Sequence, residues 1–116
     1  MGDPQPAARH DVGQVKILTT AEGRRVVLSG EIDMLCREAL DSALLRATEG
    51  TPIVVIDLAG VTFLSSDGLA FLAQLHRRAD ALGQPVTLLD PPRVAQRALT
   101  LSGLLSLFTV ATSRTS

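Results

Sequence analysis

One continuous run, Asp57 to Leu69, constrains the fold of this chain more than any other feature. It begins at the end of an apolar stretch, Ile53 to Leu58, which is typical of a buried β-strand. After a short loop, a Ser-Ser-Asp-Gly corner begins an amphipathic helical pattern. A strand that leads through a loop into a helix is the unit of α/β domains. The N-terminus of such a helix is partly positive, so it displays polar side chains and free N–H groups.

Length and composition allow one domain. A chain of 116 residues, 46% of them hydrophobic, can bury one core but is too short for two. We assign residues 13–111 to the domain, residues 1–12 to a flexible leader and residues 112–116 to a tail. The leader contains Pro4 and Pro6 and lacks the apolar segment of a signal peptide.

The periodicity of apolar residues predicts an α/β fold. Strands are expected near residues 15–18, 25–28, 53–58, 86–89 and 107–110, and helices near 36–47, 66–82 and from Pro92 onward. The order β-β-α-β-α-β-α-β predicts a mostly parallel sheet of four or five strands with packed helices, opened by an antiparallel hairpin. The unbroken apolar character of residues 53–58 predicts a strand that is covered on both faces.

Bulk properties exclude several classes of partner. The formal net charge is −1 and the basic residues form no run, so we expect no nucleic-acid partner. No stretch approaches the roughly 18–20 apolar residues that span a bilayer, so we expect no membrane insertion. The single cysteine, Cys36, cannot form an internal disulfide, and with no export signal this indicates the cytoplasm.

The sequence also lacks the patterns of an enzyme. His10, His76 and Cys36 have no metal-ligand spacing, and no phosphate-binding loop or nucleophile elbow is present. No general base is identifiable for Ser65 or Ser66. We therefore expect no catalysis, no metal and no cofactor.

Two aspartates near strand ends have structural explanations. Asp57 sits late in its strand, as a receiver-type phosphoacceptor does, but no companion acidic pair follows the first strand. Asp33 follows the second strand and is expected to cap the first helix.

The corner has a purely local interpretation. Ser65 or Ser66 can serve as helix N-cap, which is worth about 1 kcal/mol. Asp67, in the first turn, gains about 0.3–1 kcal/mol from the helix dipole. Gly68 has no side chain, so the backbone of another molecule could approach closely. For an isolated Ser-Ser-Asp-Gly sequence, helix capping would be explanation enough.

The surrounding residues resemble a known family. The run from Asp57 to Leu69 is similar to Asp-Leu-Ser-x-Val-x-Phe-Met-Asp-Ser-Ser-Gly-Leu, the pattern of STAS domains, the anti-sigma-factor antagonist family. Without a gap, the residues that sit where the family pattern wants them are Asp57, Leu58, Gly60, Val61, Phe63, Ser66, Gly68 and Leu69. Gly30 to Asp33 resembles the family's Gly-Glu-Leu-Asp, and Leu101 to Phe108 resembles its Leu-x-Gly-Leu-x-x-x-Phe. The resemblance covers about residues 13–111 and implies a single STAS-like domain.

The resemblance implies a protein-binding switch in transcription regulation. Typical members bind an anti-sigma factor that is also a serine kinase, and the kinase phosphorylates the serine before the glycine. Here that position holds Asp67, and Ser65 stands where the family has aspartate. The partner-binding residues carried over from the family are Asp33, Ser65, Ser66, Asp67, Gly68 and Leu69.

The exchange at Asp67 leaves three alternatives open. The protein could stay in the released state toward a family kinase, bind a different partner constitutively, or accept phosphate on Ser65 or Ser66 instead. We favour constitutive binding, because aspartate copies phosphoserine only in part and carries about one charge instead of nearly two.

STAS domains also occur as structural subunits of larger complexes, including stress-signalling assemblies and lipid-transport ATPases. The chain stops at Ser116, soon after the last expected strand, whereas many relatives continue into another helix. We therefore expect apolar sheet surface that a partner or a homodimer contact would cover.

Overall fold

Five strands form one sheet in the sequential order β1-β2-β3-β4-β5. The computed structural model describes residues 12–113, so the predicted leader up to residue 11, with His10, and the end of the tail lie outside the described residues. The elements are β1 (Gln14–Thr19), β2 (Arg24–Ile32), the 3₁₀ turn η2 (Met34–Cys36), α1 (Arg37–Thr48), β3 (Val54–Leu64), α2 (Ser66–Ala81), β4 (Val86–Leu89), α3 (Arg93–Leu101), the 3₁₀ turn η3 (Leu105–Leu107) and β5 (Thr109–Ala111).

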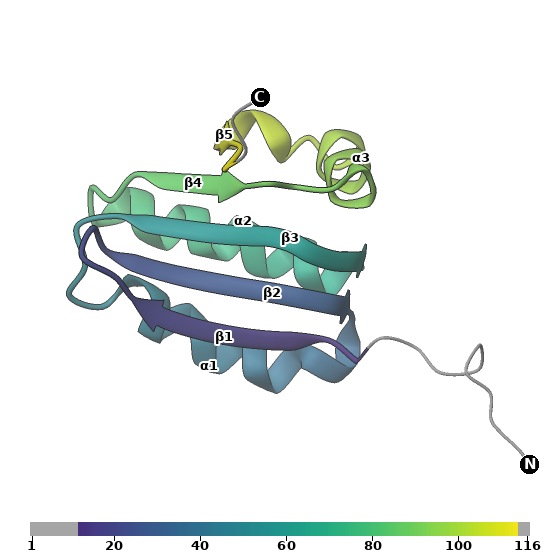
Figure 1. Cartoon of the computed structure of the whole chain (residues 1–116), viewed down its shortest axis with the longest axis horizontal. Helices are drawn as coiled ribbons and strands as arrows, with labels where there is room; N and C mark the ends of the chain where they lie inside the picture. The colour runs from purple at the N-terminus through teal and green to yellow at the C-terminus, as the bar shows by residue number, and fades with distance from the viewer. Residues whose placement is uncertain (1–11, 114–116) are drawn as a thin grey trace, which may run out of the picture.

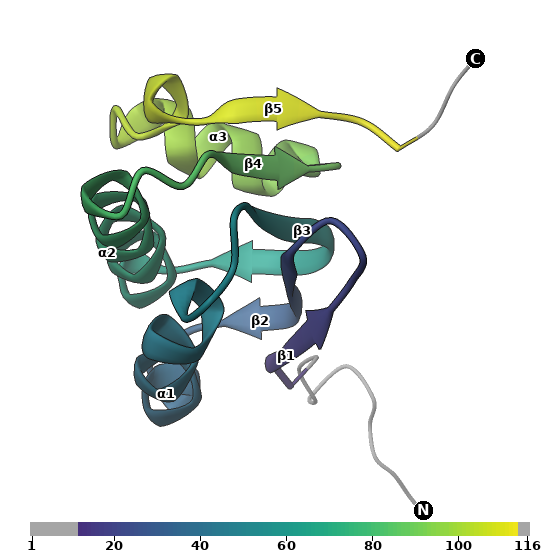
Figure 2. The same ribbon diagram turned by 90° about the vertical axis from the view of Figure 1, so that its left-hand side faces the viewer.

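The predicted α/β order is confirmed. β1 pairs antiparallel with β2, and all other neighbouring strands pair in parallel. The crossover helices α1 and α2 lie on the same face of the sheet, as Figure 2 shows from the end of the strands. α3 lies beyond the carboxyl end of β4 and packs against β3 (Figure 1).

The core lies between the sheet and the helices α1 and α2. Alternate residues of β2 and β3 point into this core, and the buried side chains of Leu72 and Leu75 of α2 belong to the same core. Fully buried strand residues include Val26, Leu28, Ile32, Ile56 and Leu58. Cys36 is also buried in this core.

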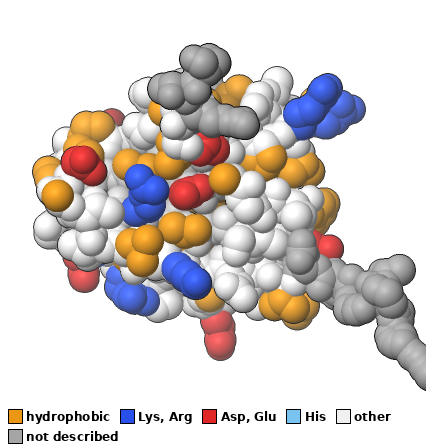
Figure 3. Space-filling model, in the orientation of Figure 1, with side chains coloured by type: hydrophobic (Ala, Val, Ile, Leu, Met, Phe, Trp, Pro, Cys, Tyr) orange, Lys and Arg blue, Asp and Glu red, His pale blue; other side chains and the backbone are white. Residues whose placement is uncertain are grey.

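The opposite face of the sheet has no helix over it in residues 12–113. Val55 and Asp57 of β3 are only half-buried there, and Figure 3 shows charged side chains among hydrophobic ones on this face. The expectation that residues 53–58 are covered on both faces is therefore wrong. β3 is apolar because Val54, Ile56 and Leu58 face the helices, while Val55 merely adds a second apolar surface.

β3 is longer than the sequence predicts. We expected the strand to end at Leu58, but pairing with β2 continues to Leu64. β3 carries extra residues at two irregularities, after Asp57 and after Val61, which shift the register relative to β2. The buried positions consequently change from a spacing of two to a spacing of three, at Leu58, Val61 and Leu64. This spacing does not resemble a strand in the sequence.

Gly68 allows α2 to pack closely on the sheet. It is buried, and a Cβ there would lie 2.5 Å from Cδ1 of Leu64 and 3.0 Å from Cγ2 of Ile32. The close approach that we expected of a partner's backbone is thus made by side chains of the same chain.

We expect Gly68→Ala to destabilise the fold by about 1–3 kcal/mol, because the added methyl overlaps a packed core and outweighs the gain in helix propensity. Denaturant unfolding measures this. The loss should shrink in a Leu64→Val background, where the nearest methyl is absent. A Gly68→Ala variant more stable than the parent would contradict the packing explanation.

Candidate functional site

Two loops meet at the carboxyl end of the sheet. β2 and β3 stay paired to their last residues, Ile32 opposite Leu64. The backbone N–H of Ser65 then donates to the carbonyl of Ile32 at 2.9 Å. The loop that begins at Asp33 and the first turn of α2 therefore lie side by side, at the end where β2 and β3 terminate in Figure 1.

Ser65 is the N-cap of α2. Its backbone is extended, with φ −83° and ψ −179°, and its Oγ accepts the N–H of Asp67 at 3.1 Å. Its carbonyl accepts the N–H of Leu69 at 2.9 Å, which begins the helical ladder. Of the two candidate caps, Ser65 fills the role because β3 holds it in extended conformation. Ser66 is the first helical residue and is exposed.

Asp67 lies in the first turn of α2, where its carboxylate is favoured by the helix dipole. It is partly exposed, not in the core. It has no hydrogen bond or ion pair through its side chain with another residue of 12–113. The carboxylate is therefore available to a second molecule. Leu69, two residues on, is half-buried and packs against the core.

Asp33 caps the 3₁₀ turn η2, which leads directly into α1. Its Oδ1 accepts the N–H of Leu35 at 3.0 Å, so Asp33 caps this turn and not α1 itself, whose N-cap, Cys36, makes no side-chain cap bond. The turn that it stabilises presents two large apolar side chains to solvent, Met34 at 69% exposed and Leu35 at 80%. We refer to Asp33, Met34, Leu35, Ser66 and Asp67 as the corner surface.

Sequence reasoning missed the apolar part of the corner surface. Met34 and Leu35 directly follow a capping aspartate and precede Cys36, where the buried stripe of α1 begins. Residues placed between a cap and the first buried position are turned outward, and this was the available signal. Phe63 of β3, opposite Glu31, adds another exposed apolar side chain near the same end of the sheet.

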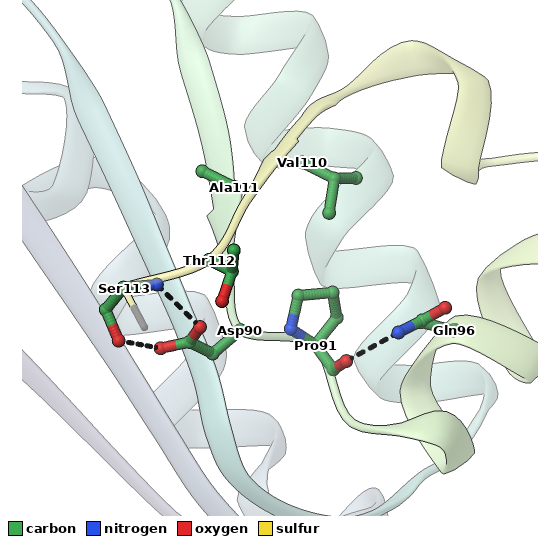
Figure 4. Close-up of a pocket in the computed structure, with 7 residues that line it drawn as sticks. All are labelled: Asp90, Pro91, Gln96, Val110, Ala111, Thr112 and Ser113. Atoms are coloured by element: carbon green, nitrogen blue, oxygen red, sulfur yellow. Dashed lines mark hydrogen bonds between the residues drawn. The ribbon is translucent and has the colours of Figure 1, made fainter. Parts of the chain in front are cut away.

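A pocket of about 580 Å³ lies elsewhere, where β4 and β5 end (Figure 4). None of the predicted site residues lines it. Ser113 donates two hydrogen bonds to the carboxylate of Asp90, one from its backbone N–H at 2.8 Å and one from its hydroxyl at 2.6 Å. The side-chain amide of Gln96 donates to the carbonyl of Pro91. These bonds hold the end of β5 and the start of α3 in place, which gives the polar groups a structural role.

The other singled-out residues also have structural contacts. Asp57 accepts the N–H of Ala59 at 3.0 Å and lies 3.9 Å from the guanidinium of Arg25. The ring of His76 meets that of Phe108 edge-on, with centroids 5.4 Å apart. Within residues 12–113, no three His, Cys, Asp or Glu residues are grouped so as to hold a metal ion. No helix of that part of the chain is long and apolar enough to cross a bilayer.

Comparison with protein families identifies the fold family. The family model described as "Mlab, STAS domain" matches residues 16–109. The chain belongs to the STAS-domain family. Comparison with curated protein sequences finds no match.

Solved structures of STAS proteins agree with this assignment. An anti-sigma factor antagonist from Mycobacterium paratuberculosis is 30% identical, with a TM-score of 0.72 over 87% of this chain and 86% of that one. A serine-to-glutamate variant of Moorella thermoacetica RsbS is 22% identical, with a TM-score of 0.74 over 87% and 88%. A structure from the stressosome is 22% identical, with a TM-score of 0.64 over 84% and 87%. At 22% identity the last two similarities concern the fold alone.

We expect Ser65→Ala to destabilise this STAS domain by about 1 kcal/mol, because the N–H of Asp67 loses its acceptor at the helix start. Ser66→Ala is the matched control and should leave the free energy of unfolding within about 0.5 kcal/mol of the parent, since its side chain is exposed. Denaturant unfolding of both variants distinguishes the roles. Equal losses would contradict the assignment of Ser65 as the cap.

Proposed function

We propose that this STAS domain is a regulatory protein-binding module that docks its partner at the corner surface, independently of phosphorylation at residue 67. The observation that carries the proposal is the carboxylate of Asp67, partly exposed and without a side-chain partner in residues 12–113, at the start of α2. A regulatory role is supported by the antagonist from Mycobacterium paratuberculosis that this chain resembles.

The chemistry of Asp67 supports constitutive binding. A serine kinase needs a hydroxyl, and aspartate offers none. A phosphoserine would add about −1.5 to −2 charge and three acceptor oxygens, whereas aspartate supplies about one charge on a shorter side chain. The partner surface therefore meets a constant, moderate negative charge. Of the two neighbouring serines, Ser66 is the more accessible hydroxyl, because the Oγ of Ser65 is engaged as the helix cap.

The proposed partner is a protein of the anti-sigma-factor or serine-kinase type in the cytoplasm. Its surface would place a hydrogen-bond donor or a cation against Asp67. Apolar side chains beside that group would cover Met34 and Leu35, whose exposure provides area for burial. We expect no nucleic acid, metal or cofactor to take part.

A second candidate function is that of a structural STAS subunit in a larger complex, such as a stress-signalling assembly or a lipid-transport ATPase. The name "Mlab" in the description of the matching family model favours it. Purification of the tagged protein from native cells separates the two: a small kinase or anti-sigma factor supports the first function, and a membrane ATPase or a large assembly supports the second.

Incubation with a cognate kinase and ATP should leave the corner of the wild-type protein unmodified. Asp67→Ser should accept one phosphate, because it restores a hydroxyl before the glycine, while Asp67→Asn should accept none. Intact-mass and peptide mass spectrometry measure both. Stoichiometric phosphate on Ser65 or Ser66 of the wild type would reverse our preference. An Asp67→Ser variant that binds family kinases yet stays unmodified would contradict the equivalence of the position.

The double substitution Met34→Ser with Leu35→Ser should weaken partner binding by about tenfold or more, since burial of one such side chain contributes about 1.5–3 kcal/mol. Stability should change little, because both side chains are exposed. Leu82→Ser is the control: it removes a side chain of similar exposure, 57%, from the other end of α2. Calorimetric titration with the purified partner measures the affinities. Equal losses from both changes would exclude the corner surface as the docking site.

A further inference from the structure

The outer faces of two helices carry opposite charges in matching patterns. On α3, Arg93 and Arg97 are followed by Leu101, and all three are exposed. On α1, Glu38 and Asp41 are followed by Leu45, and these too are exposed. We refer to the first set as the basic stripe and to the second as the acidic stripe.

The basic stripe has no counter-charge of its own. The side chains of Arg93 and Arg97 make no hydrogen bond or ion pair within residues 12–113, and residues 91–113 contain no aspartate or glutamate. Leu101, at the end of the stripe, is 78% exposed. A shallow hollow of about 560 Å³ runs along these residues. A face with two unpaired cations and an exposed leucine lacks a covering surface.

The acidic stripe lies on the side of α1 that faces away from the core, and the exposed Arg37 and Arg46 flank it. The buried residues of the helix, among them Leu40, Ala43 and Ala47, occupy the other side. The carboxylates of Glu38 and Asp41 also have no side-chain partner within residues 12–113. Leu45 is 49% exposed.

The two stripes have nearly the same length. Leu101 follows Arg93 by eight positions, or about 12 Å of helix, and Leu45 follows Glu38 by seven, or about 10.5 Å. In each stripe the leucine follows the second charge by four residues. Two such helices side by side and parallel place each arginine near a carboxylate and the two leucines against each other.

We propose that the chain associates with a second copy of itself, the basic stripe of one copy lying on the acidic stripe of the next. Within one copy the stripes cannot meet, because α1 lies behind β1 and β2 while α3 lies past β4, across the sheet (Figure 1). The contact joins different surfaces of the two copies, so it is head-to-tail and repeats along a row or a ring. It involves no phosphorylation and does not depend on the proposed function.

The association is weak and sensitive to salt. Ion pairs between exposed side chains contribute little, so we expect association only at high protein concentration. Analytical ultracentrifugation at millimolar protein should show a mass above that of the monomer in about 0.01 M salt, where charges act over about 30 Å. The mass should return to that of the monomer in about 1 M salt. A clean monomer at low salt would overturn the proposal.

Charge reversal tests the pairing itself. Arg93→Glu with Arg97→Glu makes both stripes acidic, and Glu38→Arg with Asp41→Arg makes both basic, so each variant alone should be monomeric. When the two variants are mixed, they should associate with each other, because each contact between them joins an acidic stripe of one variant to a basic stripe of the other. If association returns on mixing, misfolding of the variants cannot explain why each of them alone is monomeric. Failure of the mixture to associate would overturn the proposal.

A matched control separates this pairing from net charge. Lys16→Glu with Arg77→Glu lowers the formal net charge by four, from −1 to −5, as the double change on α3 does. Both control residues are exposed and lie outside the two stripes. The control variant should keep the wild-type self-association at low salt. Loss of association in the control equal to that in the α3 variant would overturn the specific contact.

Discussion

The parallel pairing of β2 with β3, maintained to Ile32 and Leu64, is the constraint on which the rest of the structure depends. It places the end of one strand beside the end of the next, and the bond from Ser65 N–H to the carbonyl of Ile32 extends that pairing into the first turn of α2. Gly68 then lets the helix lie close to the same two strand ends. The corner surface is therefore positioned by backbone pairing and core packing, not by the flexibility of loops.

At the start of α2, fold stability and a binding charge use the same groups. Ser65 satisfies a backbone N–H, and Asp67 lies where the helix dipole favours a carboxylate. A negative charge at this position supports the helix instead of straining it. The permanent charge that we propose for partner binding is thus compatible with the start of this helix. This compatibility makes constitutive binding physically reasonable.

Much of this could be predicted from the sequence, and the failures have identifiable causes. The order of elements, α2 and the cap at Asp33 followed from periodicity and local hydrogen-bonding chemistry, which need only neighbouring residues. The length of β3 did not follow, because register shifts against β2 change its buried spacing from two to three. The exposure of Met34 and Leu35 did not follow either, since apolar residues next to a helical stripe are indistinguishable from core by type alone. For β3 the deciding information lies in a partner strand distant in the sequence, whereas for Met34 and Leu35 it lies in their place between the capping Asp33 and the buried Cys36.

Composition hides the separation of charge in this molecule. A formal net charge of −1 excludes a strong electrostatic footprint, yet α1 carries the exposed pair Glu38 and Asp41, and α3 carries the exposed pair Arg93 and Arg97. The two surfaces also differ in their physics. The proposed contact at the corner surface combines burial of Met34 and Leu35, which salt does not screen, with the charge of Asp67, whereas the proposed contact between the stripes relies mainly on exposed charges, which salt does screen. The contact between the stripes should therefore weaken more at high salt than the contact at the corner surface.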